Sequence, residues 1–195
     1  MPAADQKIIK NLSIWGAVFA IIFGTLLHFV YVWSGKNFIV GLFAPVNESP
    51  WEHMKLVFTP ILLFGLIDFY WLKIKLARAK ATRNYPLCFA LWKEIAAGIV
   101  FILLLFYSYT GIVGHSILAI DIGSFFVAII LAKWLGYAVL VGKFERFEFK
   151  GLNLIAAILL LALTGFFFYT TIDPPRCHPF FDSVTKTYGI YQSAE

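Results

Sequence analysis

The sequence predicts an all-α fold: a polytopic transmembrane helical bundle of about five spans, with residues 1–195 forming a single membrane domain. Hydrophobic residues make up 61% of the chain and charged residues 14%. With a mean hydropathy of +0.81, this composition lies outside the range of water-soluble globular proteins. The net charge of +5 comes from short loops and not from a basic stripe, so no nucleic-acid partner is expected. The expected partner is the lipid bilayer.

Five apolar segments are long enough to cross a bilayer, which takes about 20 residues at a helical rise of 1.5 Å. They cover residues 11–33, 55–72, 88–110, 116–142 and 151–172. The first segment follows two lysines, as a signal peptide would. It is longer than the roughly 7–15 apolar residues of a signal peptide and no cleavage site follows it, so we predict a retained span.

The basic residues in the short loops predict an orientation with the N-terminus inside and the C-terminal tail outside. The inner side then carries Lys7, Lys10, Lys73, Lys75, Arg78, Lys80, Arg83, Lys143, Arg146 and Lys150, and the outer side carries Lys36, Lys55, Arg176 and Lys186. A multi-pass protein of the cytoplasmic membrane is therefore expected. Cys88 and Cys177 fall on opposite sides, which excludes an intramolecular disulfide.

Two outer segments lie outside this frame of spans. The outer loop 34–54 is largely apolar, so an interfacial position and a re-entrant path into the bundle both fit. The outer tail 173–195 opens with Asp173-Pro174-Pro175, which ends the last helix. It also carries several aromatic residues, and both a lid folded back on the outer end and a flexible tail agree with this composition.

Two ionisable residues lie inside the predicted spans on the outer side. His28 is about five residues below the outer end of the first span and Asp121 about five residues into the fourth, which puts both on the order of 7 Å deep. Ionisable groups at that depth are costly unless they are paired, hydrated or functional. We predict that they share an outward-facing polar site, and a plain hydrogen bond between helices is the structural alternative.

Histidines and carboxylates on the outer side supply the chemistry of this predicted site. The predicted metal ligands are His28, His53 and His115, and the predicted catalytic residues are Glu48, Glu52 and Asp121. Imidazole and carboxylate groups bind Zn²⁺ and related divalent metals, and a site with an open position can activate water. Without metal, the same groups act as general acid and base. The spacing matches no established metal motif, so both alternatives stay open.

Structural roles also fit several of these residues. Ser49-Pro50-Trp51-Glu52 matches a capping box, in which the Glu52 side chain reaches back to the amide of the N-cap residue Ser49. Glu48 fits an exposed loop carboxylate, and His115 fits a residue at a helix start. His178 is predicted to be an uninvolved tail residue.

A second polar cluster is predicted toward the inner side. It consists of Asp68 in the second span, Lys93 and Glu94 in the third, and Lys133 in the fourth. Opposite charges inside spans most simply pair and neutralise one another, so we predict structural ion pairs. A proton or ion path from this cluster to the outer site is the functional alternative.

Three stretches of the chain carry a resemblance to a known family. They are His28-Phe29-Val30-Tyr31-Val32-Trp33-Ser34-Gly35, Phe43-Ala44-Pro45-Val46-Asn47-Glu48-Ser49-Pro50-Trp51-Glu52-His53-Met54-Lys55-Leu56, and the tail Phe181-Asp182-Ser183-Val184-Thr185-Lys186-Thr187-Tyr188-Gly189-Ile190. They resemble the signature and ending of a family of small bacterial membrane proteins classed as a domain of unknown function. Ser183 and Lys186 stand where that pattern would have Asp-Pro and Thr-Gly. The resemblance implies a bacterial inner-membrane protein, draws attention to His28, Asn47, Glu48, Glu52 and His53, and implies no chemistry.

Three functions fit these observations. The first is a metal-dependent hydrolase or transferase that acts on a lipid-like substrate at the outer leaflet. The second is a small-solute binding or transport component, in which the outer site captures a small molecule and the inner cluster couples its movement. The third is a structural or assembly protein whose polar residues only hold helices together. The sequence leaves open whether the protein is an enzyme.

Overall fold

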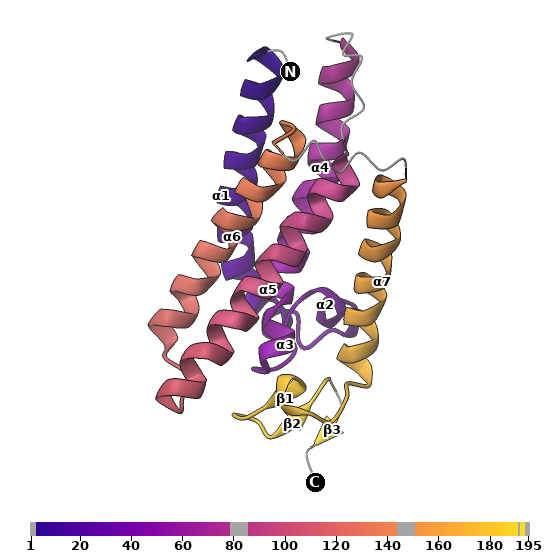
Figure 1. The fold of residues 1–195 in the computed structure, drawn as a ribbon. Helices are drawn as coiled ribbons and strands as arrows, with labels where there is room; N and C mark the ends of the chain where they lie inside the picture. The colour runs from indigo at the N-terminus through magenta and orange to yellow at the C-terminus, as the bar shows by residue number, and fades with distance from the viewer. Residues whose placement is uncertain (1–2, 79–85, 144–150, 191, 194–195) are drawn as a thin grey trace.

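The protein is a bundle of long antiparallel helices with a small sheet at one end (Figure 1). The computed structural model describes residues 3–78, 86–143, 151–190 and 192–193. Within these ranges the long helices are α1 (Ala3–Trp33), α4 (Lys55–Arg78), α5 (Leu87–Val113), α6 (Leu118–Leu140) and α7 (Leu152–Ile172). Five helices of the described part are long and apolar enough to cross a membrane. The predicted all-α, multi-pass fold is confirmed.

The helices extend past several of the predicted spans. α1 begins at Ala3, well before the predicted start at residue 11, and α4 continues to Arg78, beyond residue 72. Hydropathy marks where the chain is apolar, whereas a helix continues into polar sequence as long as its backbone hydrogen bonds can form. The loop residues Lys80, Arg83, Arg146 and Lys150, which contribute to the predicted orientation, lie outside the described residues. The orientation in the membrane stays a prediction.

Helix α5 occupies a central place in the bundle, where it packs against α4, α6 and α7, and α1 packs against α4 and α6. The interior contains apolar side chains that are fully buried, including Ala20, Ile61, Ile95, Ile129 and Phe167. Many large apolar side chains cover the outside of the same helices, among them Trp15 (66% exposed), Leu104 (65%) and Leu161 (74%). A soluble monomer rarely exposes so much apolar surface, but a bundle in contact with lipid requires it.

Glycine allows close helix contacts at two places that position polar side chains. A Cβ atom at Gly24 would lie 2.6 Å from the backbone oxygen of Leu56, and a Cβ atom at Gly136 would overlap the Glu94 carboxyl group. Small residues allow helix backbones to approach in membranes. α1 therefore meets α4 one turn before His28, and α6 meets α5 beside Glu94.

The segment 34–54 and the tail cover the end of the bundle opposite the N-terminus (Figure 1). We call this part the loop–sheet end; it comprises α2 (Phe38–Phe43), α3 (Pro50–His53), the 3₁₀ helix η2 (His178–Phe180) and the strands β1 (Phe181–Asp182), β2 (Thr187–Tyr188) and β3 (Gln192–Ser193). The strands form an antiparallel sheet in the order β1-β2-β3, with Phe181 opposite Tyr188 and Thr187 opposite Ser193.

The described part of the tail folds back onto the bundle. The Ile190 amide donates to the carbonyl oxygen of Thr171 on α7 at 2.9 Å, and the Trp51 ring packs against Phe180 of the tail with centroids 5.2 Å apart. Gly189 has φ +56°, and a Cβ atom there would lie 2.6 Å from the Thr171 oxygen. Since only glycine adopts this conformation at such a close approach without strain, the residue helps to dock the tail.

Candidate functional site

Three side chains meet at the loop–sheet end although they come from different segments. His28 lies near the end of α1, Glu48 lies just before α3, and His53 is the last residue of α3. Glu48 Oε2 lies 3.3 Å from His53 Nε2, and the other carboxyl oxygen, Oε1, lies 3.9 Å from His28 Nε2. The two imidazole centroids are 5.3 Å apart. One ligand atom from each residue lies within 4.8 Å of the other two, so the group could hold a metal ion.

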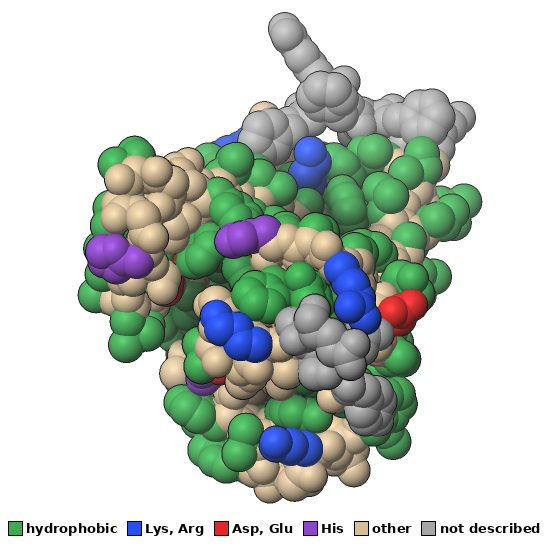
Figure 2. Space-filling view, turned by 90° about the horizontal axis from the view of Figure 1, so that it is seen from below, with side chains coloured by type: hydrophobic (Ala, Val, Ile, Leu, Met, Phe, Trp, Pro, Cys, Tyr) green, Lys and Arg blue, Asp and Glu red, His purple; other side chains and the backbone are tan. Residues whose placement is uncertain are grey.

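This cluster is accessible from the end of the bundle. The side chains of His28 and His53 are 31% and 30% exposed, and that of Glu48 is 47% exposed. Figure 2 looks onto this end, where hydrophobic side chains cover much of the surface and basic side chains and separate histidines lie among them. The three ligands are therefore partly sheltered by protein and still open to a small molecule.

A backbone contact orients the His53 ring toward Glu48. His53 Nδ1 lies 3.0 Å from the Ser49 carbonyl oxygen. A carbonyl can only accept, so Nδ1 carries the proton, and in the neutral ring the Nε2 lone pair faces the cluster. Contacts of this kind commonly orient metal-binding histidines. Without a metal, a hydrogen bond from Nε2 to Glu48 requires the doubly protonated ring. This bond lowers the pKa of Glu48, although burial of Glu48 acts in the opposite direction. Burial lowers the pKa of His53, but the hydrogen bonds to Glu48 and Ser49 and the charge of Glu48 outweigh it and raise that pKa.

The turn before α3 places Glu48 and His53 relative to each other. Ser49 is the N-cap of α3, and its Oγ accepts the Glu52 amide at 3.3 Å, with Pro50 at the first helical position. Asn47 Oδ1 accepts the Ser49 amide at 3.0 Å. Only half of the predicted capping box is present, because the Glu52 carboxyl group does not return to Ser49 and instead points inward.

Below this turn, Glu52 and Lys55 form a buried ion pair. Lys55 Nζ is 2.7 Å from Glu52 Oε2, and it also donates to the Gly41 carbonyl oxygen at 2.8 Å and to Thr171 Oγ1 at 2.5 Å. The Val46 amide donates to Glu52 Oε2 at 3.0 Å. The lysine thus joins α2, α3 and α7, and Glu52 is occupied by this structural network and not by the open cluster.

The tail supports Glu48 from the other side. The Glu48 amide donates to Asp182 Oδ2 at 3.1 Å, and Asp182 is fully buried. Its carboxyl group also accepts hydrogen bonds from the amides of Val184 and Thr185 and from the Thr185 hydroxyl. Burial alone would raise the pKa of Asp182, but these hydrogen bonds lower it.

Two residues predicted for the outer site lie elsewhere. Asp121 accepts a hydrogen bond from the Tyr109 hydroxyl, which itself accepts the Ile117 amide at 3.1 Å. His115 is exposed in the turn between α5 and α6. That turn forms a separate tip of the bundle (Figure 1), where Ile112 is 87% exposed. Asp121 therefore takes part in a hydrogen bond between helices, which was the structural alternative from the sequence. In the described part of the chain, neither Asp121 nor His115 joins the His28 cluster.

The inner cluster contains three of its four predicted members. Lys133 Nζ lies 2.8 Å from Glu94 Oε2 and 3.5 Å from Asp68 Oδ2, which links α6, α5 and α4. Lys93 is exposed, and its Nζ lies 5.4 Å from the centroid of the Phe89 ring. Consecutive residues on a helix point about 100° apart, and here Glu94 faces the interior while Lys93 faces the outside.

Sequence reasoning missed the residues that support the site. Lys55 was assigned only to the outer charges, although Glu52 and Lys55 stand at i,i+3 on a helix start, a spacing that favours pairing. Asp182 carried no local signal, because its partner Glu48 is 134 residues away. Thr171 looks like any polar residue near a helix end, and its contact with Lys55 depends on tertiary packing.

The fold and this site define a multi-pass helical membrane protein with a histidine–glutamate cluster at one end. The chain belongs to the family described as Family of unknown function (DUF6512), whose model matches residues 3–190. No curated protein and no solved structure matches the chain. The family description carries no chemistry, so a function has to be argued from the geometry.

Proposed function

We propose that His28, Glu48 and His53 bind a divalent transition metal such as zinc, and that the protein is a metal-dependent hydrolase or transferase for a lipid-like substrate. The observation that carries this proposal is the convergence of two imidazoles and one carboxylate, with their ligand atoms within 4.8 Å. These are the donor groups that zinc prefers.

The distances support this proposal in detail. With bonds of about 2.1 Å, two ligands of a tetrahedral zinc ion lie about 3.4 Å apart. Glu48 Oε2 and His53 Nε2, at 3.3 Å, already have this separation. His28 Nε2 lies 3.9 Å from the other carboxyl oxygen, Oε1, so the side chains must move closer for all three to bind one ion. The Nδ1 contact of His53 with the Ser49 carbonyl oxygen leaves Nε2 available as the ligand.

The expected chemistry follows from the number of ligands. Three protein ligands leave a coordination position open, and a bound zinc ion there lowers the pKa of water to about 7, which supplies a nucleophile at neutral pH. The cluster lies at the end of an apolar bundle, where a polar head group at the membrane surface can reach it. The predicted orientation, which is part of the proposal, puts this end on the outer face.

Metal analysis of purified protein tests the binding step. Wild-type protein, loaded with zinc and then dialysed, is expected to retain about one metal ion per chain, and His28→Ala and His53→Ala to retain much less. His115→Ala and His178→Ala are matched controls, because they remove a histidine outside the cluster. Wild-type protein without zinc, or equal retention in all four variants, would contradict the metal site.

The enzymatic step needs its own assay. Proteoliposomes containing the zinc-loaded protein can be mixed with fluorogenic phospholipid esters and lipid-linked phosphates. We expect turnover that requires zinc and is lost in Glu48→Gln, whose side chain keeps its size but binds metal poorly. If the protein retains zinc but turns over none of these substrates, the metal site stands and the proposed enzymatic activity on them is contradicted.

A further inference from the structure

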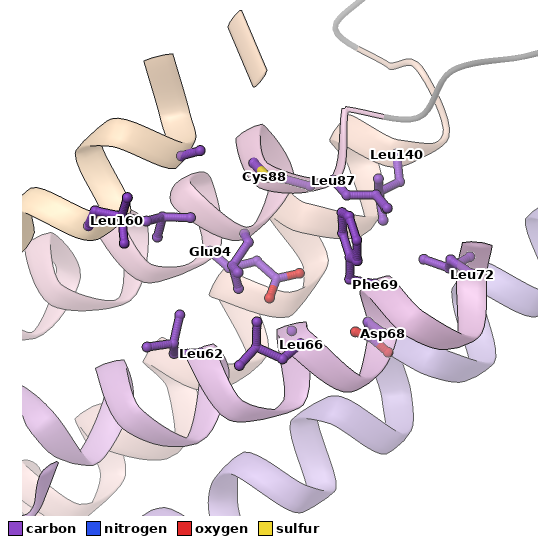
Figure 3. A pocket seen from close by; sticks show the side chains of 15 residues that line it. Leu62, Leu66, Asp68, Phe69, Leu72, Leu87, Cys88, Glu94, Leu140 and Leu160 are labelled. Carbon is purple, nitrogen blue, oxygen red and sulfur yellow. The ribbon is translucent and has the colours of Figure 1, made fainter. Parts of the chain in front are cut away.

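A cavity of about 350 Å³ lies between helices α4, α5 and α7, toward the end of the bundle that carries the N-terminus. Its volume is at the small end of the range for ligand sites. Apolar side chains form nearly all of its wall, including Leu62, Leu66 and Phe69 from α4 and Leu160 from α7. In Figure 3 the polar atoms among these side chains are the carboxyl oxygens of Asp68 and Glu94 and the sulfur of Cys88.

The polar part of this wall carries more acceptors than its partner can satisfy. Asp68 and Glu94 share one cation, Lys133, at 3.5 and 2.8 Å. Asp68 Oδ1 is buried and has no hydrogen-bond partner among the described residues. A buried carboxylate oxygen without a donor is costly, and an unbalanced negative charge inside a membrane span more so. Among the described residues, Asp68 Oδ1 thus lacks a hydrogen-bond donor and the two carboxyl groups have one cation between them, and a positively charged donor would satisfy both deficits.

The direction of the cavity fixes the shape of the missing group. Along α4, Leu62 and Leu66 precede Asp68, and Leu72 follows it toward the end of the helix. An alkyl chain along Leu62, Leu66 and Leu160 would point to the middle of the bundle. Its head group would then lie at Asp68 and Glu94, whose positions on two different helices allow both carboxyls to contact it.

We propose that this cavity binds a single-chain amphiphile with a primary ammonium head group. The ammonium donates to the Asp68 carboxyl group, which turns its Oδ1 toward the cavity, and completes the charge balance with Glu94 and Lys133, while the chain fills the apolar part. The site lies at the other end of the bundle from His28, Glu48 and His53, so the inference is independent of the metal proposal.

Cys88 provides the readout, since its thiol lines the cavity and is only partly buried. We would use the full chain with Cys177→Ser, reconstituted in lipid nanodiscs, and measure the rate at which N-ethylmaleimide modifies Cys88. Dodecylamine is the probe, and dodecanol and dodecanoic acid are matched chains with a neutral and an anionic head. At about ten times the half-protecting concentration, dodecylamine should slow the modification about tenfold, because only the empty cavity reacts.

Two variants separate the head-group contact from the apolar fit. Asp68→Asn keeps the size of the side chain and should lose the protection by dodecylamine, with zinc retention unchanged. Ala157→Phe fills the cavity from α7 and keeps the ion pairs; it should also abolish protection, which covers the case in which the Asp68 variant fails to fold. Equal protection by dodecanol, undiminished protection in Asp68→Asn, or no protection of the parent protein would each overturn the proposal.

Discussion

Replacement of Lys55 by methionine tests the network that holds the loop–sheet end together. The ammonium group is fully buried. It donates to the backbone carbonyls of Gly41 and Ala44 and to the side chains of Thr171 and Glu52. Removal of one partner from a buried ion pair typically costs 3–5 kcal/mol, because the other charge stays buried and unpaired. Glu52 keeps the Val46 amide as a donor at 3.0 Å, so we expect the lower end, about 3 kcal/mol.

The measurement is the free energy of unfolding in mixed micelles titrated with a denaturing detergent. The matched control is the double variant Glu52→Gln/Lys55→Met, which removes both charges and should recover most of the lost stability, since replacement of a whole buried pair is often neutral. Because Lys55 also anchors α2 beside the segment that carries Glu48, the single variant should weaken zinc retention. A loss below about 1 kcal/mol, or a double variant less stable than the single one, would refute the reasoning.

Three further predictions concern the close helix contact, the tail and the orientation. Gly24→Leu should lower zinc retention, because even a Cβ atom there would lie 2.6 Å from a backbone oxygen of α4 and the helix that carries one histidine ligand would be displaced; unchanged retention would contradict this. The carboxyl group of Asp182 has a lowered pKa in the folded protein, so its contribution to tail docking is complete above the ordinary pKa of about 4 and is lost as the pH falls below it. Limited proteolysis of the tail should therefore accelerate only in acid, and Asp182→Asn should be cleaved quickly already at pH 7. In intact cells an impermeant maleimide should label Cys177 and spare Cys88, and the reverse pattern would invert the orientation.

Composition and hydropathy were sufficient to predict the architecture. Segments of about 20 apolar residues have few alternatives to a membrane helix, so the fold class needed no tertiary information. The helix ends at Ala3 and Arg78 were missed because hydropathy carries no signal for a helix that continues into polar sequence.

The site was predictable only in part, for a geometric reason. Depth in a span identified His28 as unusual, and proximity along the chain linked Glu48 to His53. The same depth argument failed for Asp121, because depth says how far a residue lies along the bundle and not which neighbour it faces. Asp121 faces Tyr109 on the adjacent helix, and this contact depends on how α5 and α6 pack.

The hydrogen bond between the Glu48 amide and Asp182 joins the open cluster to the far end of the chain. A ligand that binds the cluster more tightly when the tail is docked must favour the docked tail by the same factor, because coupling between two equilibria is reciprocal. Release of the tail would in turn weaken that ligand without any change in its direct contacts. The C-terminal residues are thus placed to act as an allosteric element, through which a partner that captures the tail could set the affinity of the cluster.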